Sequence, residues 1–218
     1  MNARKLIEWA GLCLLAALSL RAQELTPPKA PFVIVPQMAR WEVTMRPLSA
    51  TKDRASEPEA LVQSVISGDL KRDVFVIPGQ KSREVWYRGG MMFLSTDDNN
   101  YAVAVDPKAE DSGIGTNVLY APDFPGVSWI DAKSFRGSVE KDGTKCLFFE
   151  KEGTPPLRAW IDEVTRRPLV VELGSSALHF SFQCPPSTPL MMPGPYEEAW
   201  KRFRALADRR KAIQNAGN

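Results

Sequence analysis

The sequence predicts a mainly β protein: an antiparallel sheet rolled into a barrel or sandwich, followed by one C-terminal helix. Three observations support this. From Trp41 onward apolar and polar residues alternate with a period of two, which is the pattern of half-buried strands. Turn-forming residues separate the alternating runs. No long helical pattern interrupts them, which argues against βαβ units.

The predicted strands follow one another at short intervals, so tight turns must join most of them. Turn chemistry is present at Pro78-Gly79, at the run from Asp97 to Asn100, at Lys141–Gly143 and at Glu152-Gly153. The strand candidates are Trp41–Met45, Val62–Ile66, Val74–Val76, Val85–Tyr87, Met91–Ser95, Tyr101–Val105, Phe135–Glu140, Lys145–Glu150, Leu157–Ile161, Pro168–Leu173 and Leu178–Gln183. A further short apolar strand over Phe32–Val35 is expected to be able to pair with a sheet edge.

A helix is predicted over residues 196–214. The proline-rich residues 185–195 end the sheet and form a stiff connector before it. Glutamates stand near its start and arginines near its end, as the helix dipole favours. One face carries an apolar stripe of Tyr196, Trp200, Phe203 and Ala207. Two interpretations remain: the stripe packs on the sheet, or a basic amphipathic helix contacts a membrane surface or a partner.

Residues 1–22 have the layout of a secretory signal peptide. Arg4 and Lys5 precede an apolar run from Ala10 to Leu20, and Ala22 offers a small residue at the cleavage position. The run has 11 residues, whereas a membrane-spanning helix needs about 20. We therefore expect a periplasmic or secreted protein with an N-terminal segment over 23–38 and a β domain over 39–184.

Removal of this leader changes both the charge and the cysteine count. It takes three basic residues and one acidic residue from totals of 28 and 26, which leaves the mature chain formally neutral. A neutral chain has no overall field to attract nucleic acid, so that partner is not expected. Of three cysteines, Cys146 and Cys184 remain. In an oxidising compartment they are expected to form one disulfide, the alternative being two unpaired buried thiols.

The sequence contains no catalytic constellation that would suggest an enzyme. His179 is the only histidine and lies in an alternating strand, so a structural role is expected for it. The cysteines and this histidine lack the spacing of a metal site, and neither a P-loop nor a nucleophile elbow is present. The acidic run from Asp97 to Asn100 is better explained as a hairpin turn than as a calcium site. No catalytic residue, metal or cofactor is predicted.

The tripeptide Trp-Ile-Asp occurs twice, at Trp129 and at Trp160. The second copy, in Arg158–Asp162 with Thr165 and Pro168-Leu169, resembles a hairpin of the LolA-like superfamily. That group includes periplasmic lipoprotein carriers and related secreted bacterial proteins. Gly79 with Glu84–Gly90 is similar to its tryptophan-bearing hairpin, and the resemblance covers mainly Asp69–Leu173. It implies a curved antiparallel sheet, or half-open barrel, with a helix across a concave face that can hold an acyl chain.

The resulting hypothesis is a binding or carrier protein with an apolar cavity for a lipid-like ligand, its partner being a lipid or a lipidated protein. The alternative is a protein-interaction or structural module of the cell envelope without a small-molecule ligand. The candidate cavity residues are large and apolar, and each is also explained by ordinary core packing. They are Trp86, Met91, Phe93, Trp129, Phe148 and Trp160.

Overall fold

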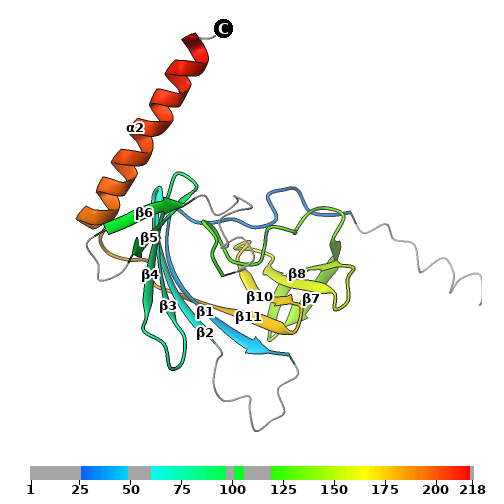
Figure 1. The fold of residues 1–218 in the computed structure, drawn as a ribbon. Coiled ribbons are helices and arrows are strands. Elements are labelled where there is room, and N and C mark those ends of the chain that lie inside the picture. The colour runs from blue at the N-terminus through cyan, green and yellow to red at the C-terminus, as the bar shows by residue number, and fades with distance from the viewer. Residues whose placement is uncertain (1–25, 49–59, 97–100, 106–118, 217–218) are drawn as a thin grey trace, which may run out of the picture.

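The structure, a computed structural model, describes residues 26–48, 60–96, 101–105 and 119–216 (Figure 1). The expected leader lies outside these residues. Eleven strands form one antiparallel sheet in the order β6-β5-β4-β3-β2-β1-β11-β10-β9-β8-β7. Since β6 and β7 are its two edges, the sheet does not close into a barrel. The predicted fold class, a mainly antiparallel sheet with a C-terminal helix, is confirmed.

Each predicted strand is present, with small shifts at its ends. The strands are β1 (Met38–Pro47), β2 (Ala60–Ser67), β3 (Leu70–Val76), β4 (Arg83–Arg88), β5 (Met91–Thr96), β6 (Tyr101–Val105), β7 (Phe135–Lys141), β8 (Thr144–Lys151), β9 (Leu157–Asp162), β10 (Pro168–Leu173) and β11 (Ser176–Gln183). The segment Phe32–Val35 is not a strand. Ile34 N donates one hydrogen bond to the carbonyl of Arg166 at 3.0 Å, and Phe32, Val33 and Val35 pack against the main core instead.

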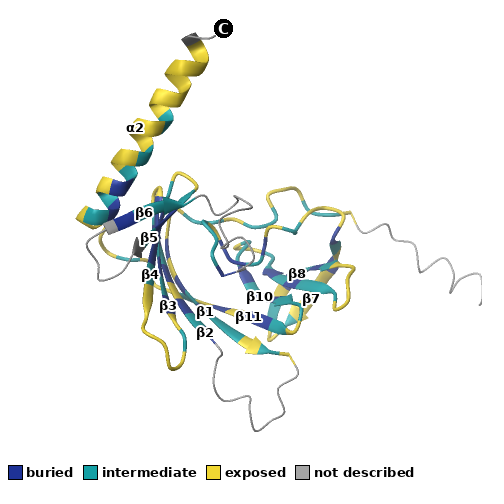
Figure 2. Ribbon diagram, in the orientation of Figure 1, coloured by how far each residue is buried: buried dark blue, intermediate teal, exposed yellow. Residues whose placement is uncertain are grey.

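The sheet is strongly bent, and its inner face carries the main core (Figure 2). The period-two pattern assigns the faces. In β1, Trp41 and Val43 are fully buried on the inner face, while Arg40 and Glu42 lie on the outer face. The register extends the inner face across the sheet, because Trp41 lies opposite Ser64 on one side and Phe182 on the other.

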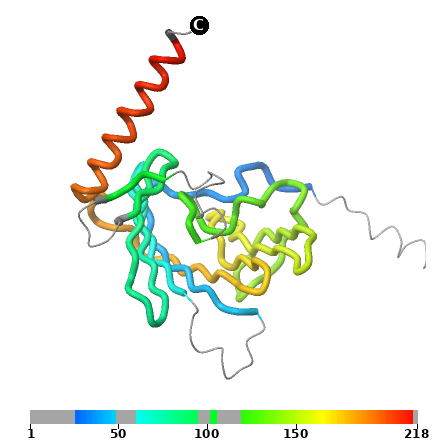
Figure 3. Tube along the Cα trace, in the orientation of Figure 1, coloured from blue at the N-terminus to red at the C-terminus, as the bar shows by residue number. Residues whose placement is uncertain are grey.

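Irregular chain covers this inner face. The connection from β6 to β7 joins the two edge strands of the sheet. Its described part includes residues 119–130, here called the strap. Leu119, Phe124 and Val127 of the strap are buried in the main core. The chain path in Figure 3 shows the strap and the N-terminal segment lying together within the bend.

The helix α2 (Gly194–Ala216) packs on the outer face, at the β5–β6 end. Its Tyr196 and Ala199 form a second core with Trp86, Phe93 and Ala102 of the sheet. The resemblance implied a helix across the concave face, and this expectation is wrong. The strap already covers that face, while the outward-facing aromatic residues of β4 and β5 provide an apolar surface for the helix.

The expected disulfide between Cys146 and Cys184 is also absent, since both are free cysteines, one buried and one exposed. Cys146 lies in β8 and Cys184 directly follows β11, with β9 and β10 between these strands. Three strand spacings amount to about 14 Å. The Cα atoms of a disulfide lie within about 7 Å, so the sheet itself holds the two thiols apart.

Candidate functional site

A lysine is buried beneath the strap. Lys71 lies on β3, the fourth strand from the β6 edge of the sheet, opposite Ile66 and Tyr87, and its side chain is 2% exposed. The sequence Lys71-Arg72-Asp73 continues the strand alternation, so Lys71 and Asp73 both point to the inner face while Arg72 points outward. Burial of a charged group is costly unless it is paired and hydrogen-bonded, so the partners of Lys71 define the site.

The ammonium group of Lys71 ties the strap to the sheet. Its Nζ donates to the backbone carbonyls of Ala121 at 2.6 Å and Asp123 at 2.8 Å. It also forms an ion pair with Asp73 Oδ2 at 2.9 Å. These three acceptors match the three protons of the ammonium. We call Lys71, Asp73 and the two strap carbonyls the Lys71 clamp.

Aromatic rings and hydroxyls enclose the clamp. Lys71 Nζ lies 4.9 Å from the ring centroid of Tyr87 and 5.5 Å from that of Trp41, distances typical of cation–π contacts. Burial raises the pKa of Asp73, an effect opposed by Lys71 and by the hydroxyls of Ser64 and Tyr87. Burial, reinforced by the negative charge of Asp73, also raises the pKa of Tyr87, so its hydroxyl remains protonated.

The strap fills the space above the clamp with aromatic packing. The Phe124 ring lies 4.9 Å from that of Trp41 and 5.7 Å from that of Phe182, in edge-to-face arrangements. At Gly126, which has a φ of 75°, an added Cβ would lie 2.6 Å from Leu173 Cδ1. The strap backbone therefore approaches the sheet as closely as a glycine allows.

The six candidate cavity residues fall in three separate places. Trp129 packs against the inner core. A second group lies on the outer face under α2, and a third on the outer face of β8 and β9, where two rings lie 5.2 Å apart. The second group is Trp86, Met91 and Phe93, and the third is Phe148 and Trp160. Only subsets are brought together, so the six do not line one cavity.

Sequence reasoning missed the Lys71 clamp. The available signal was Lys71 and Asp73 at two positions where the alternation of β3 calls for apolar residues. The strap partners of Lys71 are backbone carbonyls, which every residue has and which a sequence therefore cannot distinguish. No pattern in the chain therefore pointed to the contact between β3 and the strap.

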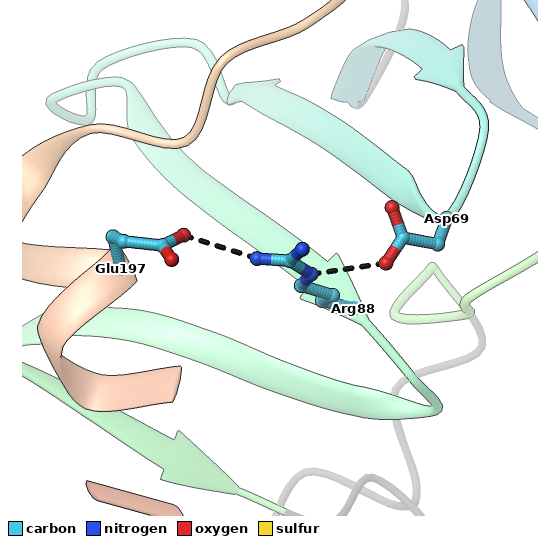
Figure 4. A network of polar contacts seen from close by, with 3 residues as sticks. All are labelled: Asp69, Arg88 and Glu197. Atoms are coloured by element: carbon cyan, nitrogen blue, oxygen red, sulfur yellow. Dashed lines mark hydrogen bonds and ion pairs between the residues drawn. The ribbon is translucent and has the colours of Figure 1, made fainter. Parts of the chain in front are cut away.

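The first turns of α2 are fixed to the outer face by a second polar network, drawn in Figure 4. Arg88 at the end of β4 donates through Nε to Asp69 Oδ2 and through a terminal nitrogen to Glu197 Oε2, both at 3.0 Å. Its guanidinium also lies 5.2 Å from the ring centroid of Trp200. At Gly89, an added Cβ would come within 3.0 Å of the Trp200 ring.

Beyond these contacts α2 leaves the sheet, as Figures 1 and 3 show. Phe203 and Ala207 are half-buried, and residues 208–215 are all exposed. Leu206 and Ile213 are 57% and 73% exposed. Among the described residues, no helix combines the length and apolar character needed to cross a bilayer.

Comparison with known proteins finds likeness to solved structures at the level of the fold. No protein-family model matches the chain, and no curated protein matches it. The fold is similar to the crystal structure of the lipoprotein LppX of Mycobacterium tuberculosis, with a TM-score of 0.40 and 9% sequence identity. The match covers 72% of this chain and 90% of that chain. At these values the likeness is one of general architecture and says nothing about function.

Proposed function

We propose that this chain is a periplasmic or secreted binding protein that holds a lipid-like apolar ligand on the inner face of its sheet. It acts by binding rather than by catalysis. The observation that carries the proposal is the covering of that face: an apolar surface lies under an irregular strap, not under regular structure. Irregular segments are less stable than the elements they connect and are the parts of proteins that open.

Displacement of the strap is the central step of this proposal. In the closed state Phe124 occupies the space over Trp41 and Phe182. A ligand chain can take that space only if the strap moves away. Apolar contacts between the strap and the sheet would then be replaced by apolar contacts between the ligand and the sheet. The hydrophobic free energy lost with the first set is therefore close to that gained with the second. The Lys71 clamp sets how strongly the closed state is favoured.

Native mass spectrometry of the purified mature chain tests this proposal. We expect a co-purifying lipid or, after delipidation, uptake of oleic acid. Phe124→Ala should increase uptake, because it removes the ring that fills the site. Trp160→Ala, on the outer face, is the matched control and should leave uptake unchanged. Absence of both lipid and oleate binding, or an equal effect of the two variants, would contradict the proposal.

The exposed end of α2 favours a second candidate function, an interaction module of the cell envelope. Residues 208–215 are all exposed, and Arg209, Arg210 and Lys211 make this end basic. The first turns are held firmly, so the free end is presented in a fixed direction.

A pull-down from envelope extract tests this candidate, comparing the full chain with a chain that ends at Ala207. A specific partner that is captured by the full chain and lost with the shortened one would support the interaction module. Capture of the same proteins by both chains would exclude the part of α2 after Ala207 as the contact.

A further inference from the structure

The outer face of the sheet carries a groove that the proposed function does not use. It has a volume of about 240 Å³ and lies over β11, β1, β2 and β3, across the sheet from the strap. This is smaller than the roughly 300 Å³ at which pockets for drug-sized ligands begin, so it suits a small group. Its side walls include Arg40, Glu42, Gln63, Val65, Arg72 and Gln183.

The strand register places the two arginines on either side of the groove. Arg40 lies opposite Val65 in the pairing of β1 with β2, and Val65 lies opposite Arg72 in the pairing of β2 with β3. The arginines are thus two strands apart in one row, about 10 Å between Cα atoms. Gln183 of β11 continues the row, because it lies opposite Arg40. Two guanidiniums at this separation can both reach one group seated over Val65.

The groove contains hydrogen-bond donors that the protein does not use. Arg40 is exposed and forms no ion pair within the described part of the chain. Arg72 donates from one terminal nitrogen to Glu84 Oε2 at 2.8 Å, which fixes its position. Its Nε is buried and has no hydrogen-bond partner. A buried donor without a partner is unfavourable, and an acceptor that reaches the guanidinium from the groove would relieve this cost.

One acidic side chain also lines the groove. Glu42 lies two residues along β1 from Arg40, and its Oε1 accepts a hydrogen bond from Gln63 Nε2 at 3.0 Å. Gln63 is neutral, so Glu42 keeps its negative charge. Among the lining residues the two arginines outnumber it by one, although Glu84, just outside the lining, offsets the charge of Arg72. Arginine forks match the oxygens of phosphate groups in shape and charge.

We propose that this groove is a binding site for a phosphate group, held between Arg40 and Arg72 with the Gln183 amide as a further donor. The source of the group is either free phosphate or the headgroup of a phospholipid. This site is independent of the inner face, since the sheet separates the two. Failure of lipid binding on the inner face would therefore not count against the phosphate site.

Titration calorimetry on the full mature chain tests the site, first with inorganic phosphate and then with dihexanoyl phosphatidylglycerol below its micelle concentration. We expect saturable phosphate binding that weakens about tenfold in Arg40→Gln and in Arg72→Gln, as for loss of a charge-assisted hydrogen bond. Glu42→Gln should tighten binding, because it removes the nearby negative charge. Arg136→Gln, at the far edge strand, is the matched control and should have no effect.

The two ligands distinguish the sources of the phosphate group. Tighter binding of the lipid than of phosphate, lost in the same variants, would assign the site to a headgroup, and the reverse would assign it to free phosphate. Thermal melts check that each variant is folded. No binding of either ligand up to about 10 mM, or equal weakening in Arg136→Gln, would overturn the proposal.

Discussion

The inner and outer faces of the same sheet are covered in opposite ways. Irregular chain covers the inner face and is held by hydrogen bonds from Lys71, whose ion pair with Asp73 has side chains that are 2% and 1% exposed. A regular helix covers one end of the outer face, held by Arg88 and Glu197 with side chains 25% and 35% exposed. Figure 2 shows the contrast in burial. Loss of one ion-pair partner therefore has different consequences on the two faces. On the inner face the remaining charge is buried with neither a counter-ion nor water, whereas on the outer face water can solvate it.

The largest effect is expected from Lys71→Met. It leaves the Asp73 carboxylate buried without its cation, and removal of one partner of a buried pair costs about 3–5 kcal/mol. The matched change on the outer face, Arg88→Met, should cost at most about 1 kcal/mol. Urea denaturation measures both. The double variant Lys71→Met/Asp73→Leu should recover most of the loss, and equal costs for the two single variants would refute the contrast between the faces.

Phe124→Ala should come next, at about 3 kcal/mol or somewhat less if the strap opens locally. The ring is 1% exposed and packs on Trp41, Phe180 and Phe182. Beyond the loss in stability, we expect new binding of a hydrophobic dye, because the inner face becomes accessible. A fully cooperative loss of stability without dye binding would show that the strap is part of the rigid core rather than a cover.

A pair of glycines tests the attachment of α2. Gly89 and Gly90 both have positive φ, but only at Gly89 would an added Cβ meet Trp200, at 3.0 Å. Both alanine variants should lose about 1 kcal/mol from backbone strain. Gly89→Ala should also loosen the helix and speed its proteolytic removal, while Gly90→Ala should not. Equal proteolysis rates would mean that the close approach to Trp200 does not hold the helix.

The smallest effect concerns His179, which is exposed on the outer face. Burial, followed by the charges of Arg46 and Lys141, lowers its pKa. The unfolded chain then binds the proton more tightly, so this group's stabilising contribution is lost as pH falls through about 6.5 towards the lower folded-state pKa. His179→Gln should flatten the pH dependence of the unfolding free energy between about pH 7 and 5. A slope identical to that of the wild type would show that His179 does not contribute.

The sequence was sufficient for the strands and for the helix, because both are encoded locally. Alternation in β1 and β2 and the apolar stripe from Tyr196 to Phe203 can be recognised within short windows. The placement of α2 could not be predicted, since it depends on which face of β4 and β5 is already covered. Nor could the Lys71 clamp, because its acceptors are carbonyls about 50 residues away whose position follows from the strap crossing the sheet.

The central claim, that the strap covers a face able to accept an apolar ligand, is tested most directly by hydrogen–deuterium exchange with and without oleic acid. We predict that bound oleate speeds amide exchange in residues 119–130 and leaves β1 to β3 protected. Oleate that binds without changing exchange in the strap, or a strap that exchanges as slowly as the sheet while no oleate binds, would contradict the account.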